Sequence, residues 1–143
     1  MKRIIILIGT ILVVILVIFS YNYIQYQINQ KIVKEYNYSF LQFNRKNIYG
    51  TDITSVINKA VNSNEQNKIS KNELGEYISN QENSIKIYIT FDPGETIYPM
   101  EKIYQKSMQE FTKLFGGVKF DCTDVAYHKN GKVSEMYFQA INY

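Results

Sequence analysis

The sequence is poor in the residues that build disulfide frameworks, metal sites and acid–base catalysis. Its 143 residues include one cysteine, Cys122, and one histidine, His128. A single cysteine cannot form an intrachain disulfide, so a disulfide framework and a four-cysteine zinc site are both excluded. Histidine is the usual acid–base group near neutral pH, and one copy offers little material for a catalytic site.

The excess of one sign of charge over the other is also small. The net charge is +3, of which Lys2 and Arg3 supply two, so the rest of the chain carries only +1. This near neutrality gives no electrostatic case for binding nucleic acid. The abundance of Ile, Lys, Asn and Tyr is typical of an AT-rich bacterial genome. The 13 tyrosines suit strands and membrane interfaces, and a sugar- or peptide-binding surface is the alternative interpretation.

One long apolar run stands at the start of the chain. Residues 4–19 contain no charged residue and no strong helix breaker. As a helix they would reach about 24 Å, and extension to Ile24 gives about 31 Å, which matches a hydrocarbon core of roughly 30 Å. Tyr21 and Tyr23 would then lie at the far interface. The sequence therefore predicts a single-pass transmembrane anchor over residues 1–24.

The basic residues Lys2 and Arg3 favour a cytoplasmic N-terminus and an extracytoplasmic remainder, in the cell membrane. A cleaved signal peptide is the competing interpretation, and it requires small residues at the cut site. The nearest candidate site places Ile18 and Ser20 at the two key positions, which is a poor match. No cysteine follows the run to make a lipoprotein signal. We therefore expect the segment to be retained as a signal-anchor.

Residues 25–46 contain no Gly or Pro and predict a helix that continues from the membrane. We assign residues 25–47 to this juxtamembrane helix. An apolar stripe at steps of four and three runs along it: Ile24, Ile28, Ile32, Tyr36, Phe40 and Phe43. Either the lower half of the stripe packs on the protein's own domain, or the upper half packs on a partner helix near the membrane. We favour the first interpretation.

Residues 48–143 predict a small extracytoplasmic domain that opens with a helix. Tyr49-Gly50 ends the first helix, and Thr51 or Asp52 is expected to cap the next one. Its apolar positions follow helical spacing: Ile53, Val56, Ile57, Ala60 and Val61. Residues 62–75 read as a solvated loop, in which Glu65 and Glu73 are too few and too poorly spaced to bind calcium.

Alternation of Ile85, Ile87, Ile89 and Phe91 with polar residues predicts a half-buried strand over 84–91. Residues 76–79 are the expected hairpin partner. Asp92-Pro93-Gly94 ends the strand with turn chemistry, to which Glu95 also belongs.

A second amphipathic helix is predicted over residues 100–115, with Pro99 at its first position and Gly116-Gly117 at its end. Its apolar face contains Met100, Ile103, Tyr104, Ser107, Met108, Phe111, Leu114 and Phe115.

The last segment predicts a hairpin of strands 118–127 and 133–141. A two-residue Asn130-Gly131 turn would mix polar and apolar residues on one face. A three-residue loop over 129–131, with Gly131 in the left-handed region, pairs Cys122 with Phe138 and Phe120 with Ala140. That register keeps the apolar faces together and sets Asp124 opposite Met136, so we choose it.

The sequence predicts no catalytic, cofactor-binding or metal site. Cys122 reads as a buried, inert thiol on an apolar strand face, and His128 as an exposed flank of the hairpin. Asp121 and Asp124 should point to opposite faces of their strand, so they make no catalytic pair. No phosphate loop, dinucleotide fingerprint, nucleophile elbow or zincin helix occurs.

This order of elements resembles the layout of type IV pilins and pseudopilins: an apolar N-terminal helix, a helical continuation and a small α+β head. Gly9 stands where their processing glycine would be, but the fifth residue after it is Val14 and not glutamate. The resemblance implies an assembly role.

The prediction is an α+β fold, with a small antiparallel sheet packed on helices behind the long N-terminal helix. The function we expect is that of a non-enzymatic interaction or assembly module. Its partners are the lipid bilayer and other membrane or surface-assembly proteins. An envelope sensor or ligand-binding accessory domain is the alternative.

Overall fold

The computed structural model describes residues 2–92, 94 and 96–141. The first helix, α1 (Lys2–Leu41), is 40 residues long. The chain divides into two units between Glu35 and Tyr36. The last turns of α1 therefore belong to the compact domain, while the rest of the helix forms a unit of its own.

Among the described residues, α1 is the one helix that is long and apolar enough to span a membrane. None of its most apolar stretch is buried against the protein. The apolar stripe divides along its length. Phe40 and Phe43 are buried and Tyr36 packs against the core, which confirms that the lower half packs on the domain. Ile28 and Ile32 remain exposed.

In the described residues, the domain combines the end of α1 with three further helices and five strands, which confirms the α+β class. Its elements are β1 (Ile48–Tyr49), α2 (Gly50–Gln66), β2 (Lys86–Thr90), β3 (Tyr98–Pro99), α3 (Met100–Lys106), α4 (Met108–Phe115), β4 (Lys119–Tyr127) and β5 (Val133–Ile141). The strand order is β1-β4-β5-β2-β3. The sheet is mixed and not wholly antiparallel, because β2 runs parallel to β5.

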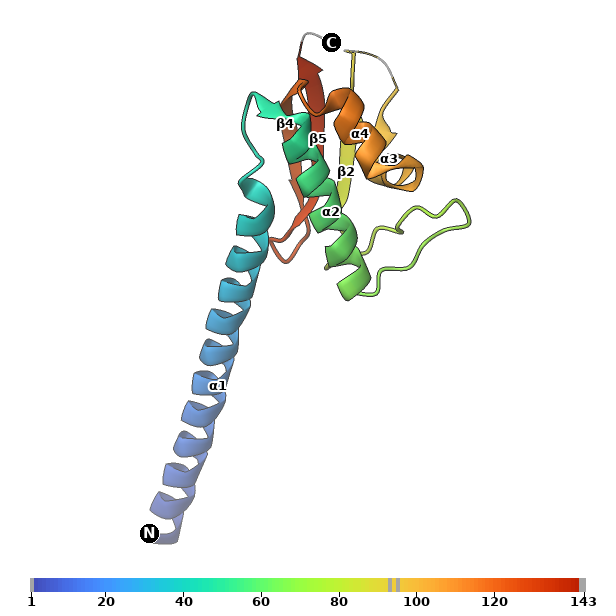
Figure 1. Ribbon diagram of the computed structural model, residues 1–143. Helices are drawn as coiled ribbons and strands as arrows, with labels where there is room; N and C mark the ends of the chain where they lie inside the picture. The colour runs from blue at the N-terminus through green and yellow to red at the C-terminus, as the bar shows by residue number, and fades with distance from the viewer. Residues whose placement is uncertain (1, 93, 95, 142–143) are drawn as a thin grey trace. The chain divides into compact units, whose positions relative to one another are not determined.

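The helices α2, α3 and α4 lie on one face of the sheet (Figure 1). From β2, Ile87 and Ile89 are fully buried, as the alternation predicted. They pack into one cluster with the apolar stripe of α2 and the inner residues of β4 and β5. The residues that alternate with them are half-buried: Lys86, Tyr88, Thr90, Glu135, Tyr137 and Gln139.

A buried amide joins α2 to this sheet. The Asn64 side chain is 0% exposed. Its Nδ2 donates to the Ile85 carbonyl at 2.8 Å, and its Oδ1 accepts from the Ile85 N–H at 2.9 Å. Ile85 precedes β2, so the amide satisfies both of its backbone groups where no ladder partner does.

The predicted hairpin is confirmed. Cys122 pairs with Phe138 and Phe120 with Ala140. The loop is closed by a His128 N–H that donates to Lys132 O at 2.8 Å. Gly131 has φ of 83°, the left-handed conformation that the three-residue loop requires.

One pairing of the hairpin was predicted wrongly. Val125, and not Asp124, lies opposite Met136, and Asp124 lies opposite Tyr137. The cause is a register shift between Cys122 and Asp124, where Thr123 is an extra residue that forms a β-bulge. The bulge restores an apolar residue to the inner face, since Val125 packs against the core.

The expected pairing of residues 76–79 with β2 is also wrong. The neighbours of β2 are β5 and the two-residue strand β3. Tyr77 instead forms an isolated antiparallel bridge with Lys71, and its N–H donates to Glu101 Oε1 at 3.1 Å. The Tyr77 N–H therefore binds the Glu101 carboxylate and not a carbonyl of a neighbouring strand.

The helix predicted over 100–115 is two helices, α3 and α4, which meet at Ser107. The Ser107 hydroxyl accepts from the Glu110 N–H at 3.2 Å. It therefore starts a new helix as an N-cap, although its position in the pattern placed it on the apolar face. Helix α4 ends at Phe115 with Gly116 as its C-cap residue, as predicted.

The boundary between α1 and α2 differs from the prediction. Helix α1 ends at Leu41 and not near residue 46, and Asn47 follows with a left-handed φ of 56°. Helix α2 begins at Gly50, and the Asp52 carboxylate accepts from the Tyr49 N–H at 3.2 Å. Asp52 thus satisfies the helix start from within its first turn.

Both edges of the sheet are short. The edge strands β1 and β3 have two residues each. Beyond β1, the outward Cys122 N–H donates to Arg45 O at 3.1 Å. Past the bulge, the Val125 N–H donates to the Asp124 carboxylate at 2.9 Å.

The turn assigned to Pro93 and Glu95 lies outside the described residues.

Truncation of buried side chains should cost far more stability than truncation of an exposed one. Phe111 and Phe138 are 6% and 1% exposed, whereas Tyr127 is 52% exposed. Phe111→Ala and Phe138→Ala should each lower the free energy of unfolding by about 3–5 kcal/mol, and Tyr127→Ala by less than about 1.5 kcal/mol. Urea melts of the fragment from residue 25 onward would measure this. A loss for Tyr127→Ala equal to that for Phe138→Ala would contradict the core described above.

Candidate functional site

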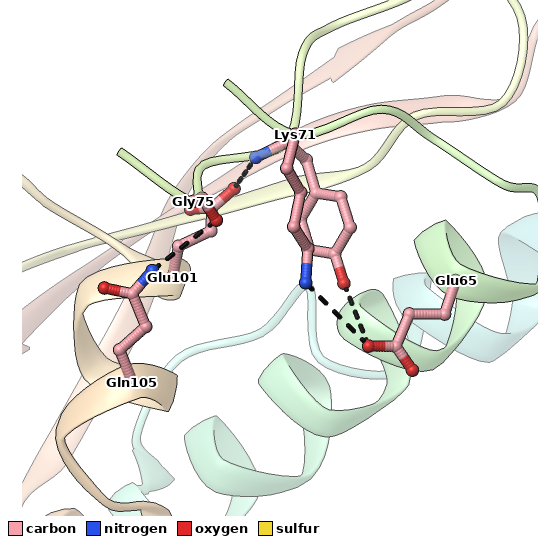
Figure 2. A network of polar contacts seen from close by, with 6 residues as sticks. Glu65, Lys71, Gly75, Glu101 and Gln105 are labelled. Carbon is pink, nitrogen blue, oxygen red and sulfur yellow. Dashed lines mark hydrogen bonds and ion pairs between the residues drawn. The ribbon is translucent and has the colours of Figure 1, made fainter. Parts of the chain in front are cut away.

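Two clusters of polar side chains hold loops of the domain by hydrogen bonds to loop residues. The first surrounds the loop between α2 and β2. Its residues come from the end of α2, the loop itself and α3: Glu65, Lys71, Gly75, Tyr77, Glu101 and Gln105 (Figure 2). The second surrounds the turn between β4 and β5.

In the first cluster, Glu65 receives two groups from the loop. The Tyr77 hydroxyl donates to Glu65 Oε1 at 3.4 Å, and Lys71 Nζ lies 4.0 Å from the same oxygen. The Lys71 ammonium also lies 4.5 Å from the centre of the Tyr77 ring. Burial, followed by the charge of Glu65 and the hydrogen bond to it, raises the pKa of Tyr77 to about 12. The phenol therefore stays protonated and remains a donor at neutral pH.

Helix α3 holds the other side of the loop. Glu101 is only 3% exposed, and its Oε1 accepts the Tyr77 N–H. Its Oε2 has no hydrogen-bond partner among the described residues. Gln105 Nε2 reaches the carbonyls of Leu74 and Gly75 at 3.4 and 3.5 Å. The cluster is thus a clamp on the loop, and we call it the loop clamp.

The second cluster we call the turn cluster. It contains residues 36–37 at the end of α1, the turn 128–133 and the loop 80–84. Asn37 Nδ2 donates to Gly131 O at 2.8 Å, and its Oδ1 accepts from the Val133 N–H at 2.9 Å. On the loop side, Asn130 Nδ2 donates to Glu82 O at 2.9 Å, and Lys132 Nζ donates to Asn83 Oδ1 at 2.6 Å.

His128 is part of this cluster and is half-buried, so its expected place as an exposed flank was wrong. Its Nε2 lies 2.7 Å from the Ser84 carbonyl oxygen. A carbonyl only accepts, so Nε2 carries the hydrogen in this contact. The ring nitrogen is engaged in holding the loop.

Cys122 lies half-buried on the inner face of β4. Its Sγ is 3.7 Å from the Asp124 carbonyl. Burial raises the pKa of the thiol to about 11, against which the hydrogen bond to the Asp124 backbone acts in the opposite direction. The thiolate is therefore scarce at neutral pH, which makes this group a weak nucleophile.

Asp121 and Asp124 were expected on opposite strand faces, and this was wrong. Their partners on β5 are Gln139 and Tyr137, two residues apart, so the bulge at Thr123 places both carboxylates on the same face. Each accepts a backbone N–H: Asp121 from Asn47 at 2.8 Å, and Asp124 from Val125 at 2.9 Å. Both carboxylates therefore have local structural partners.

Two tyrosines meet on that same outer face. The rings of Tyr88 and Tyr137 stack with centroids 4.8 Å apart, and the Tyr137 hydroxyl donates to Glu135 Oε2 at 2.6 Å. Burial, followed by the Glu135 carboxylate, raises the pKa of Tyr137. The stack therefore covers one face of each ring.

No group of three or more His, Cys, Asp or Glu side chains that could hold a metal occurs in the part of the chain that the structure describes. Sequence reasoning missed the polar residues that matter most here: Glu101, Asn37 and Lys132. Asn64 was missed as well, because residues 62–75 were read as a solvated loop, whereas α2 runs to Gln66, but the sequence did contain a signal for it. It continues the apolar stripe of α2, three residues after Val61, and a polar residue in such a position needs a buried partner.

The sequence matches no family model, and no curated protein and no solved structure matches it.

The loop clamp can be tested by removing the Glu101 carboxylate. Glu101→Ala leaves the buried Tyr77 amide without an acceptor, at a cost of about 1–3 kcal/mol. Limited trypsin digestion should then cut faster at Lys68 and Lys71, while Glu101→Gln, which keeps an acceptor, should remain close to the native rate. Glu110→Ala, an exposed glutamate on α4, is the control. Equal cleavage of Glu101→Ala and Glu110→Ala would mean that the clamp does not hold the loop.

The Cys122 thiol should react slowly in the folded protein. A pKa of about 11 instead of 9.0 lowers the thiolate fraction at pH 8 about 100-fold, since each pKa unit is a factor of ten. Alkylation by iodoacetamide should therefore be about 100-fold slower in buffer than in urea. The folded-state rate should keep rising as the pH is raised toward 11. A plateau near pH 9 would contradict the assignment.

Proposed function

We propose that this chain is a single-pass membrane protein that displays a small, non-enzymatic interaction or assembly domain outside the cell membrane. The observation that carries the proposal is the uncovered apolar surface of α1. Between Ile4 and Phe19, each large apolar side chain with a described exposure has 41–69% of its surface exposed. A continuous apolar surface of this extent is not stable in water, and a lipid bilayer is the surrounding that matches its length.

The ends of the apolar segment support an orientation. Lys2 and Arg3 border it directly on the N-terminal side, whereas the first basic residue on the other side is Lys31. Tyr21 and Tyr23 lie between and suit the outer interface. We therefore place the N-terminus in the cytoplasm and the domain outside.

The non-enzymatic character rests on what the reactive groups do. The His128 ring contacts the Ser84 carbonyl, and the Cys122 thiol has a raised pKa. Asp121 and Asp124 each bind a backbone amide. With these groups engaged in local contacts, recognition through the domain surface is the activity the chain supports best. The pilin-like layout of anchor, helix and head supports assembly as the form of that recognition.

A sensor or ligand-binding accessory role is the second candidate. It is favoured by the turn cluster, in which one turn contacts both the end of α1 and loop 80–84, whose residues 80–82 are exposed. A sensor needs such a connection between its anchor and its outer surface.

Membrane attachment can be tested with two matched leucines. Leu16 in the apolar run and Leu114 on α4 are similarly exposed, at 64% and 61%. A charged residue at the centre of a membrane span costs about 2.5–3.5 kcal/mol. Leu16→Arg combined with Val13→Arg should therefore shift the protein from the carbonate-resistant membrane pellet to the soluble fraction, and Leu114→Arg should not.

Orientation and retention are read from the native chain in the same cells. Protease added to cells stripped of their wall should degrade the domain, and the membrane-bound chain should keep residues before Ser20. Full protection until lysis would reverse the topology. A mature chain that begins near Tyr21 would make the protein secreted and remove the anchor from the proposal.

A further inference from the structure

The turn 128–133 is a closed unit held from inside. The Gly131 N–H donates to His128 O at 2.9 Å, and the Lys132 N–H donates to the Asn130 side chain at 3.1 Å. Together with the closing bond between His128 and Lys132, these contacts leave the turn little freedom to deform. A force applied to one side of it is therefore passed to the other side.

Its two sides have different neighbours. The backbone of Gly131 and Val133 is bound by Asn37 of α1. The side chains of His128, Asn130 and Lys132 are bound by loop 80–84. Alternate residues of one short turn thus contact two segments that are more than 40 positions apart in the sequence.

One ammonium group touches both neighbours at once. Lys132 Nζ donates to Asn83 Oδ1 at 2.6 Å and lies 5.3 Å from the centre of the Tyr36 ring. Tyr36 and Asn37 are consecutive residues of α1. Lys132 therefore gives a second connection between α1 and the loop, in addition to the one that Asn37 makes through the turn backbone.

Loop 80–84 is itself organised as one body. Asn80 Oδ1 accepts three successive backbone N–H groups, from Glu82, Asn83 and Ser84, at 2.8–3.0 Å. The Ser84 hydroxyl accepts the Asn80 N–H at 2.9 Å and donates to the Asn80 carbonyl at 3.2 Å. Ile85, the next residue, is fixed by the buried amide of Asn64. A loop built in this way moves as a unit or not at all.

We propose that the turn 128–133 energetically couples the end of α1 to loop 80–84. Whatever displaces loop 80–84 changes how the last turns of α1 are held in the domain, and a change in α1 alters the loop in return, because such coupling is reciprocal. Residues 80–82 of the loop are exposed, and α1 is the segment that continues into the proposed anchor. This inference goes beyond the proposed function, since the coupling lies within the domain and does not depend on membrane attachment.

The test is amide hydrogen exchange of the full chain in detergent micelles, measured residue by residue. Asn37→Ala removes both amide contacts to the turn. Exchange should rise about fivefold, the factor that corresponds to one ordinary hydrogen bond, at Val133 and also at Glu82, Asn83 and Ser84. Gln42→Ala is the control. Gln42 also lies near the end of α1, and in the described part of the chain its amide donates to Ser39 O, three residues away, so both sites should keep their native rates.

The reverse direction uses Asn80→Ala, which dismantles the loop without touching the helix. It should accelerate exchange at Val133 by a factor similar to that of Asn37→Ala at the loop. Acceleration of Val133 alone in Asn37→Ala, or of the loop alone in Asn80→Ala, would overturn the coupling.

If Asn37→Ala raises exchange throughout α2 as well, Asn37→Asp takes its place. That variant keeps an acceptor for the Val133 N–H but cannot donate to Gly131, and the loop amides must still respond. An unchanged loop in Asn37→Asp would reject the proposal. The result is independent of the fractionation experiment, so a failure of the coupling and a failure of the membrane assignment can be told apart.

Discussion

The fold of the domain depends on one buried amide. Asn64 is the polar member of an otherwise apolar helix face, and it makes two hydrogen bonds to Ile85 inside the core. Apolar packing alone would let α2 slide along the sheet, because dispersion contacts have little directionality. A buried amide that loses its partners is strongly unfavourable. The pair therefore fixes the position of α2 against the start of β2, which in turn sets where loop 80–84 begins and where it meets the hairpin turn.

The elements that follow from local patterns were predicted well from the sequence. The alternation around Ile87, the helical stripe through Ile57 and the glycine of the β4–β5 turn each report on residues close in the chain. The misses share a different cause. The parallel pairing of β2 with β5, the bulge at Thr123 and the break at Ser107 each depend on a choice between competing partners. Periodicity does not show which partner a backbone amide will take.

The polar clusters were harder to foresee than the fold. Glu101 and Asn37 sit beside apolar residues in the sequence, and nothing in their spacing marks them as partners of Tyr77 or Gly131. They become meaningful only when distant segments are brought together. Asn64 was missed too, since its segment was read as a solvated loop, although a polar residue at the next core position of a regular stripe is a local signal that could have identified it. Of the residues singled out by their chemistry, Cys122 was placed correctly on the inner face of its strand, while His128 and the pair Asp121 and Asp124 were not.

If α1 anchors the chain in a membrane, as proposed, the short edges of the sheet have a consequence for how copies meet. Molecules held on one membrane meet each other far more often than molecules in free solution, and an exposed strand edge would then invite unlimited strand-by-strand polymerisation. Here the outward amide of Cys122 is taken by Arg45, and that of Val125 by the preceding aspartate. Along this edge of β4, contacts between crowded copies would therefore fall to side chains, which can be specific and reversible, and not to these two backbone amides.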